Sequence, residues 1–214
     1  MKATGYVFKP RVYIGSEPPA TVLEDESRFG NNGAFKADGE PDWVQLPSGL
    51  WVLNFDHSDD MITVPHHSSL ALTAWTITAW EKRNAIDDRQ DIVNKRTQGY
   101  NYFVAADNYL GCQFKSGGDL KTDYSAVVSV TDLDWHFVAV TFKQPDMVFF
   151  VDDASEARVF DWPPDVSDDI LVIGTQGFSN WWDGFLTPPK IFNYALSAGQ
   201  VKKIFEAERH FFGV

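Results

Sequence analysis

The sequence predicts an all-β protein, a two-sheet antiparallel jelly-roll sandwich with a short C-terminal helix. Short runs of β-branched and aromatic residues recur along the chain and are separated by Gly, Pro, Asn and Asp, which is typical of many antiparallel strands. Aromatic residues make up 15% of the 214 residues, a content that excludes a disordered chain. No linker, repeat or break in composition divides the sequence, so we expect a single domain over residues 1–214.

The expected strands follow one another at short spacing. In chain order they are Tyr6–Ile14, Trp51–Phe55, Met61–Val64, Trp75–Lys82, Asp91–Lys95, Tyr100–Ala106, Tyr109–Lys115, Trp135–Phe142, Met147–Val151, Ile170–Gly174 and Lys190–Tyr194. Stacking two sheets of such strands buries one face of each sheet without demanding helices. The side chains expected to be buried include Trp75, Ile77, Phe137, Val138, Phe149 and Ile191.

Turn residues separate neighbouring strands and predict hairpins. Residues 107–108, 144–146 and 152–153 are Asp-Asn, Gln-Pro-Asp and Asp-Asp, and each group lies between two strand candidates. Near the C-terminus, Ser197 and Gln200 have the spacing of a capping box at the start of a helix. We expect this helix to be short and to pack against the sheets.

Net charge and cysteine content limit the classes of partner and of site. Lys and Arg number 18 and Asp and Glu 30, a formal net charge of −12 that repels phosphate backbones and anionic lipids. We therefore expect no nucleic acid and no membrane insertion, and neutral or cationic glycans rather than sulfated or uronic ones. No export signal is visible in the sequence as given. Cys112 is the single cysteine, so no intrachain disulfide forms, and we expect it to be buried.

Several motifs follow one another in a fixed order from Asp25 to Phe205. Residues 25–33 contain an Asp and a Ser followed by Gly-Asn and a closing Gly, and residues 53–65 read as a strand, an Asp-Asp turn and a second strand. Residues 182–186 and 191–197 close the series. The ordered set resembles the bacterial and viral laminin-G-like domains of the concanavalin A-like lectin/glucanase superfamily, although His57 stands where that family usually has Gly. The resemblance implies a jelly roll in an extracellular, virion or cell-surface setting.

The fold alone leaves function open, because it hosts lectins, carbohydrate-binding modules, hydrolases, lyases and adhesion modules. The hydrolases of this superfamily carry paired carboxylates on a central strand. Here the strand candidates 100–106, 109–115, 135–142 and 147–151 contain no Asp or Glu. A nucleophile elbow, a metal-binding His-Glu-x-x-His and a phosphate-binding Gly-rich loop are also absent from the sequence. We therefore do not expect an enzyme.

The 25–33 loop has the composition of a calcium site, since Ca²⁺ is held by carboxylate, amide and backbone oxygens. The resemblance implies a structural Ca²⁺ held by the Asp25 carboxylate and by an amide or backbone oxygen of Asn31 or Asn32. In the closing motif, however, Thr187 and Pro188 stand where the family usually has acidic residues. The alternative is a loop closed by its own hydrogen bonds.

Loop tryptophans are the candidates for a sugar site, because sugars pair an apolar face of C–H groups with a rim of hydroxyls. Trp181, with Asn180 and Asp183 beside it, has that chemistry. Trp162 and Trp43 lie next to prolines in loop-like sequence and could alternatively hold their own loops together.

We interpret the chain as a non-catalytic, lectin-like carbohydrate-binding module whose partner is a glycan or polysaccharide. A second hypothesis is a structural or adhesion module of a virion or cell-surface assembly that packs against other proteins. A third is a glycan hydrolase or lyase, which would need two carboxylates facing each other in a groove. Loop tryptophans that are exposed and grouped on one face would favour the first hypothesis over the second.

Overall fold

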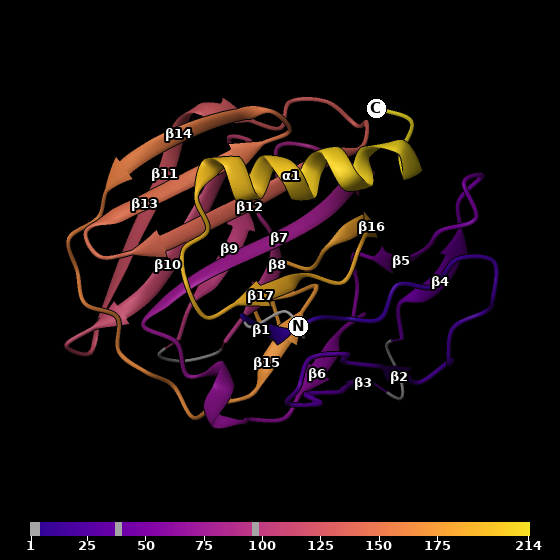
Figure 1. Cartoon of the computed structure of the whole chain (residues 1–214), viewed down its shortest axis with the longest axis horizontal. Coiled ribbons are helices and arrows are strands. Elements are labelled where there is room, and N and C mark those ends of the chain that lie inside the picture. Colours follow the sequence, from indigo (N-terminus) through magenta and orange to yellow (C-terminus); the bar gives the residue numbers. More distant parts are fainter. Residues whose placement is uncertain (1–4, 37–39, 96–98) are drawn as a thin grey trace.

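Two antiparallel sheets dominate the computed structural model, which describes residues 5–36, 40–95 and 99–214 (Figure 1). The first sheet has nine strands, in the order β14-β13-β12-β7-β16-β5-β4, with β17 pairing with both β7 and β1. Its strands are β1 (Tyr6–Phe8), β4 (Asp42–Gln45), β5 (Trp51–Asp56), β7 (Ala74–Arg83), β12 (His136–Lys143), β13 (Asp146–Val151), β14 (Ala154–Val159), β16 (Asp183–Leu186) and β17 (Lys190–Phe192).

The second sheet has eight strands in the order β11-β10-β9-β8-β15-β6-β3-β2. Its strands are β2 (Val22–Leu23), β3 (Gly33–Phe35), β6 (Ile62–Val64), β8 (Gln90–Asn94), β9 (Asn101–Val104), β10 (Tyr109–Ser116), β11 (Asp119–Ser129) and β15 (Leu171–Ile173). This all-β, two-sheet architecture confirms the fold class that the sequence predicts.

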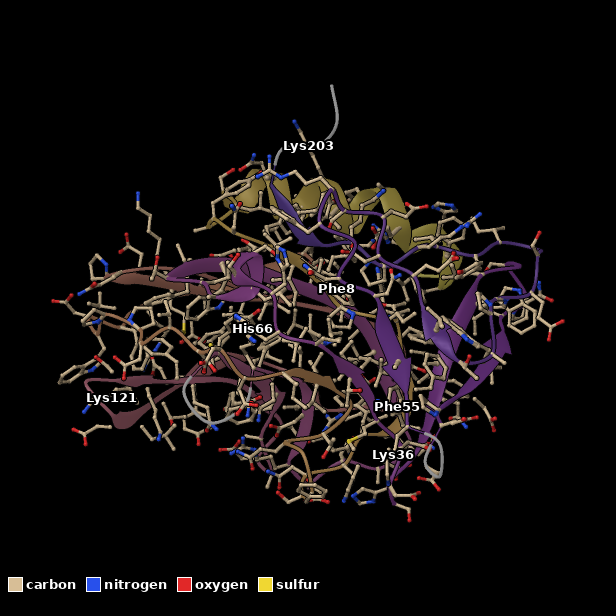
Figure 2. All side chains as sticks on the ribbon, turned by 90° about the horizontal axis from the view of Figure 1, so that it is seen from below. Phe8, Lys36, Phe55, His66, Lys121 and Lys203 are labelled. Carbon is tan, nitrogen blue, oxygen red and sulfur yellow. The ribbon has the colours of Figure 1, made fainter. Side chains whose placement is uncertain are left out.

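The main core lies between the sheets, where alternate side chains of each strand point inward. Trp75 and Ile77 of β7 belong to this core, whereas the Thr76 hydroxyl, on the other face, donates a hydrogen bond to the Tyr194 carbonyl. Figure 2 shows Phe8 in the interior, and Phe8 belongs to the same cluster. All six side chains named above as expected to be buried are fully buried: Trp75, Ile77, Phe137, Val138, Phe149 and Ile191.

The C-terminal helix α1 (Ala198–Glu208) covers the outer face of the nine-stranded sheet (Figure 1). Ser197 and Gln200 form the predicted capping box, and Val201 and Phe205 bury their side chains against Trp80 and its neighbours on the sheet. Within the described residues, short 3₁₀ helices occur at Ser68–Leu70 (η1) and Arg209–Phe211 (η3). None of the helices in the described residues is long and apolar enough to cross a membrane.

The hairpin predictions are confirmed, while several strands differ from expectation. Residues 105–108 join β9 to β10, residues 144–145 connect β12 and β13, and residues 152–153 connect β13 and β14, so each predicted turn lies at a hairpin. The expected strand Tyr6–Ile14 ends at Phe8, after which Pro10, which has no N–H to donate, and Ile14 form only isolated bridges. The long edge strand β11 is an addition to the expected set.

Candidate functional site

A row of amide side chains crosses the eight-stranded sheet. Asn94 of β8 lies opposite Asn101 of β9, and Asn101 lies opposite Gln113 of β10. Gln113 in turn pairs with Thr122 of β11. Directly opposed residues in an antiparallel sheet place their side chains on the same face, so Asn94, Asn101, Gln113 and Thr122 form one continuous polar row, the amide row.

The amide row lies on the outer face of its sheet. Tyr102 of β9 and Cys112 and Phe114 of β10 are buried in the core between the sheets. Because strand side chains alternate between faces, Asn101, which precedes Tyr102, and Gln113, which lies between Cys112 and Phe114, point away from that core. The helix α1 covers the other sheet, so the amide row is not beneath it.

A groove of about 290 Å³ opens over this row. Its lining residues are Asn94, Gly99, Asn101, Gln113, Lys115, Leu120 and Gln176. Among these described residues there is no carboxylate, and the side chain of Lys115 is the one charged group. The groove therefore offers amide donors and acceptors together with a cation.

Asn101 is a buried polar residue of the groove, with only 2% of its surface exposed. Its Nδ2 donates a hydrogen bond of 2.5 Å to the Asp91 Oδ2 atom. Its Oδ1 has no hydrogen-bond partner among the residues that the structure describes. Buried amide oxygens are normally paired, so this acceptor lacks the donor that a ligand hydroxyl would supply.

Asp91 fixes the orientation of the Asn101 amide. It accepts hydrogen bonds from Arg89 Nε at 2.9 Å and Arg89 Nη2 at 3.3 Å. Burial raises the pKa of Asp91, and the hydrogen bonds from Arg89 and Asn101 oppose that rise. Because Asp91 accepts the Asn101 amide hydrogen, Oδ1 is left as the free end of the side chain.

Aromatic side chains adjoin the amide row. Phe103, Gly111 and Tyr124 lie opposite one another on β9, β10 and β11, two residues along from the row. Gly111 is required here, since a Cβ at this position would lie 2.3 Å from the Phe103 ring. Tyr124 is 42% exposed and meets Phe103 edge-on, with ring centroids 5.8 Å apart. An exposed ring therefore lies beside the polar groove.

Of the predicted sugar-site residues near Trp181, Asn180 is connected to the groove. Its Nδ2 donates to Oε1 of Gln176, a lining residue, at 3.0 Å, and its carbonyl accepts from the Asp91 N–H at 3.0 Å. Trp181 itself is half-buried and is not a lining residue. Asp183 accepts a hydrogen bond from the Asn84 side chain at 2.9 Å.

The other two loop tryptophans lie elsewhere. Trp43 is half-buried, donates from Nε1 to the Pro19 carbonyl at 3.1 Å and packs against Tyr13. Trp162 is 46% exposed, and the Lys121 ammonium lies 4.3 Å from its ring centroid. Trp43, Trp162 and Trp181 share no hollow and no ring contact within the described residues. They therefore form no common platform in this structure.

A second hollow, of about 220 Å³, is apolar and lies beside the C-terminal end of the chain. Trp43 and Trp51 line it together with Ile14, Phe211 and Phe212. Trp51, the first residue of β5, is only half-buried, and its Nε1 has no hydrogen-bond partner among the described residues. This hollow is a candidate surface for contact with an apolar group.

In the 25–33 loop, the Asp25 carboxylate is already engaged by the chain. Oδ1 accepts from the backbone N–H groups of Lys9 and Ser27, and Oδ2 accepts from the Ser27 hydroxyl and the Asn31 N–H. The exposed Asn32 accepts from the Asp25 N–H through Oδ1. Each of these oxygens accepts a hydrogen bond from an N–H or O–H donor, which is the arrangement that the hydrogen-bonded alternative expects.

The closing motif adds no acidic ligand. The Thr187 hydroxyl accepts from the Trp80 N–H at 2.9 Å, and Pro188 lines the apolar hollow. A separate acidic group in the described residues joins Asp56, Asp59 and Asp60, whose carboxylate oxygens lie within 4.8 Å of one another. Burial raises the pKa of Asp60 to about 6, and its Oδ2 accepts from the Asp56 N–H, so this carboxyl helps to close its own turn.

The fold resembles several solved binding domains of toxins. The binding domain of Paraclostridial Mosquitocidal Protein 1 has a TM-score of 0.72 and 16% identity, over 95% of this chain and 52% of that chain. Botulinum neurotoxin type C, whose cell entry depends on interaction with two ganglioside molecules, has a TM-score of 0.70 and 11% identity, over 95% and 51%. The binding domain of botulinum neurotoxin DC, solved in complex with rat synaptotagmin II, has a TM-score of 0.68 and 12% identity, over 94% and 51%.

At these identities the likeness concerns the fold, and this chain spans about half the length of each of those chains. No curated protein matches the sequence of this chain. Residues 56–202, more than half of the chain, match the family Laminin_G_3, described as the concanavalin A-like lectin/glucanases superfamily. The same region contains most of both sheets and all of the amide row. The chain therefore belongs to the concanavalin A-like lectin/glucanases superfamily.

Proposed function

We propose that this chain is a non-catalytic carbohydrate-binding module that binds its glycan in the groove over the amide row. The observation that carries the proposal is the buried Asn101, whose Oδ1 lacks a hydrogen-bond donor among the described residues. Amide side chains both donate and accept hydrogen bonds, as sugar hydroxyls do. A ligand hydroxyl that donates to Asn101 would satisfy this acceptor.

The dimensions of the groove support an oligosaccharide rather than a single small polar group. Neighbouring strands lie about 4.8 Å apart, so the row from Asn94 to Thr122 spans about 14 Å across four strands. Tyr124 and Leu120 add exposed apolar surface beside it, against which the C–H face of a sugar ring can lie. The sheet hydrogen bonds hold these side chains in place before binding, which lowers the entropic cost of association.

The chemistry of the lining supports binding rather than hydrolysis. Glycoside hydrolysis uses two carboxylates about 5 to 9.5 Å apart on either side of the sugar. The described lining of the groove has no carboxylate, and the nearby Asp91 is paired with Arg89. The similar structures that are described as receptor-binding domains of toxins agree with a binding role and with an extracellular location.

The proposal is tested by matched amide variants. A glycan array of neutral and acidic oligosaccharides, read with and without EDTA, would identify the best ligand, which is then titrated calorimetrically. We expect Gln113→Ala to weaken binding by about tenfold, as for the loss of a hydrogen bond at a desolvated site. The control Gln45→Ala removes an exposed amide on β4, in the other sheet, and should leave affinity unchanged.

A melting curve for each variant separates loss of binding from loss of folding. Full affinity in a folded Gln113→Ala variant, or the absence of any glycan bound by the wild-type chain, would contradict the proposal. Such a result would favour the structural or adhesion hypothesis over carbohydrate binding, and the apolar hollow around Trp51 would be the contact surface for a protein partner.

A further inference from the structure

We infer that the groove selects acidic sugars and binds the sugar carboxylate on the ammonium group of Lys115. This inference rests on the proposed carbohydrate-binding function and specifies the ligand class. Lys115 lies two residues beyond Gln113 on β10, on the same face and about 6.8 Å farther along the strand. It is opposite Leu120 of β11, and both residues line the groove.

Within the described residues, the Lys115 ammonium has no partner of opposite charge. Its side chain is half-buried, yet it forms no ion pair within 4.0 Å of any carboxylate in residues 5–36, 40–95 and 99–214. An ammonium group without a counter-ion can bind an incoming anion without first breaking an existing ion pair.

The acidic side chains on neighbouring elements are all engaged elsewhere. Asp91 on β8 binds Arg89, while on β11 Asp119 binds Lys121 and Asp123 binds Arg158. Asp165, whose N–H donates to the Lys115 carbonyl, accepts through its carboxylate from the N–H groups of Gly117 and Gly118. The groove thus keeps one cation free in a chain with 30 acidic residues.

A sugar carboxylate fits this position because an ammonium–carboxylate hydrogen bond is charge-assisted and short, at about 2.7–2.9 Å. The amide row would take the hydroxyls of the same or the next ring. Hexuronic acids and nonulosonic acids both carry such a carboxylate on a hydroxylated ring, and the inference covers this shared chemistry.

The net charge of −12 limits the ligand to sparsely charged glycans. Charges farther from the ligand than about 8 Å are largely screened at physiological ionic strength, so the nearby Lys115 outweighs more remote acids for a single carboxylate. A densely charged polyanion would extend beyond the groove and meet the acidic surface. For this groove, the inference therefore differs from the expectation of neutral or cationic glycans that overall composition gives.

The inference is tested with pairs of oligosaccharides that differ only in the acidic group. One pair compares a hexuronic-acid-terminated oligosaccharide with its carboxyl-reduced hexose form, and the other compares a sialylated oligosaccharide with its desialylated form. We expect the wild-type chain to bind at least one acidic member about tenfold more tightly than its neutral partner. Rising NaCl concentration should reduce this preference.

Lys115→Gln should abolish the preference, so that the acidic and neutral members of each pair bind this variant with equal affinity. The matched control is Lys121→Gln, because Lys121 lies on the same hairpin but is opposite Phe114, on the core side, and contacts Trp162 instead. Equal binding of acidic and neutral members, or an undiminished preference in Lys115→Gln, would overturn the inference and leave the carbohydrate-binding proposal standing. Absence of binding to all four oligosaccharides and to the glycan array would instead remove that proposal itself.

Discussion

His57 shows how a single residue can depart from a family pattern without changing the fold. Its φ is 64°, the left-handed region that glycine adopts most readily, and this explains why Gly is usual at this position in the family. The His57 N–H donates to the Trp182 carbonyl, and its Nε2 lies 3.2 Å from Asp88 Oδ2. These contacts partly compensate for the backbone strain of a non-glycine residue.

Asp25 organises the 25–33 loop through the donors that surround its carboxylate. In EDTA, we expect Asp25→Asn to lower the free energy of unfolding by about 1–3 kcal/mol, because the amide NH₂ would face N–H and O–H donors. Urea unfolding followed by tryptophan fluorescence measures this, with the exposed Asp153→Asn as control.

The calcium prediction can be tested with the same two proteins, the wild-type chain and Asp25→Asn. Millimolar Ca²⁺ should then raise the melting temperature of the wild-type chain, by mass action on the folded state, and should not do so for Asp25→Asn. If neither calcium nor EDTA changes the melting temperature of the wild-type chain, the loop is closed by hydrogen bonds alone.

The edge strand β11 is held by one carboxylate from β14. Glu156 Oε2 accepts from the consecutive N–H groups of Ala126, Val127 and Val128, at 2.8, 2.7 and 3.3 Å. These N–H groups lie where β11 departs from regular pairing with β10. Exposed backbone N–H groups on an edge strand can pair with strands of other chains. By accepting hydrogen bonds from these groups, Glu156 links the two sheets and prevents such pairing.

We expect Glu156→Gln to lower the free energy of unfolding at pH 7 by about 1–2 kcal/mol, because a charged acceptor is replaced by a neutral one. Burial opposes ionisation, but the three backbone N–H donors and Arg158 outweigh it and lower the pKa of Glu156 below 4.5. The carboxylate therefore contributes stability above pH 4.5, and this contribution is lost as the pH falls through the lowered pKa.

Urea unfolding of wild type and variant between pH 3 and pH 7 measures this difference. The difference in unfolding free energy between wild type and Glu156→Gln should become smaller as the pH approaches 3. The exposed Glu26→Gln should differ little from wild type at any pH. A gap that stays constant with pH would mean that Glu156 acts through packing and not through charge.

Central strands could be predicted from sequence because their apolar and aromatic runs are dense, as in β7 and β12. The edge strand β11 could not, because an edge needs fewer core side chains and Asp119–Ser129 reads as polar. Of the residues predicted from sequence for a sugar site, Asn180 is the one that hydrogen-bonds to a described lining residue of the groove, Gln176. Asn101 and Gln113 are polar residues in otherwise apolar strands, which was a usable signal, but their alignment depends on pairing between strands that a sequence does not contain.

At the scale of the whole molecule, the two outer faces differ. The face of the nine-stranded sheet is covered by α1, from which Lys203 projects away from the sheets (Figure 2). The face of the eight-stranded sheet carries the amide row and its groove. One outer face is thus occupied by helix packing, and the proposed function places ligand binding on the other.

Stability of the whole molecule should depend on pH through His136. Its Nδ1 lies 2.9 Å from Asp152 Oδ2 and its Nε2 2.9 Å from Asp132 Oδ1, so both nitrogens donate only when the ring is charged. Burial acts to lower the pKa of His136, but the hydrogen bonds to Asp152 and Asp132 outweigh it and raise the pKa from 6.5 to about 9.

A raised histidine pKa stabilises the folded state fully below pH 6.5, and this contribution disappears as the pH rises through 9. We expect wild type to exceed His136→Gln in unfolding free energy by about 2 kcal/mol near pH 6 and by much less near pH 10. Chemical denaturation across this range measures the difference, with the exposed His210→Gln as control. A difference that does not change with pH would contradict this assignment.

The amide row exists only when β8, β9 and β10 pair in the correct register, so it can report on correct folding. If β9 were displaced by one residue against its neighbours, Asn101 would turn into the core and Tyr102 would turn out to solvent. Such a chain could keep its strand content and still lose the groove. Circular dichroism would not separate molecules with the correct strand register from molecules with a shifted register, but ligand binding would. The fraction of refolded protein that binds ligand would therefore measure how often the strands pair in the correct register.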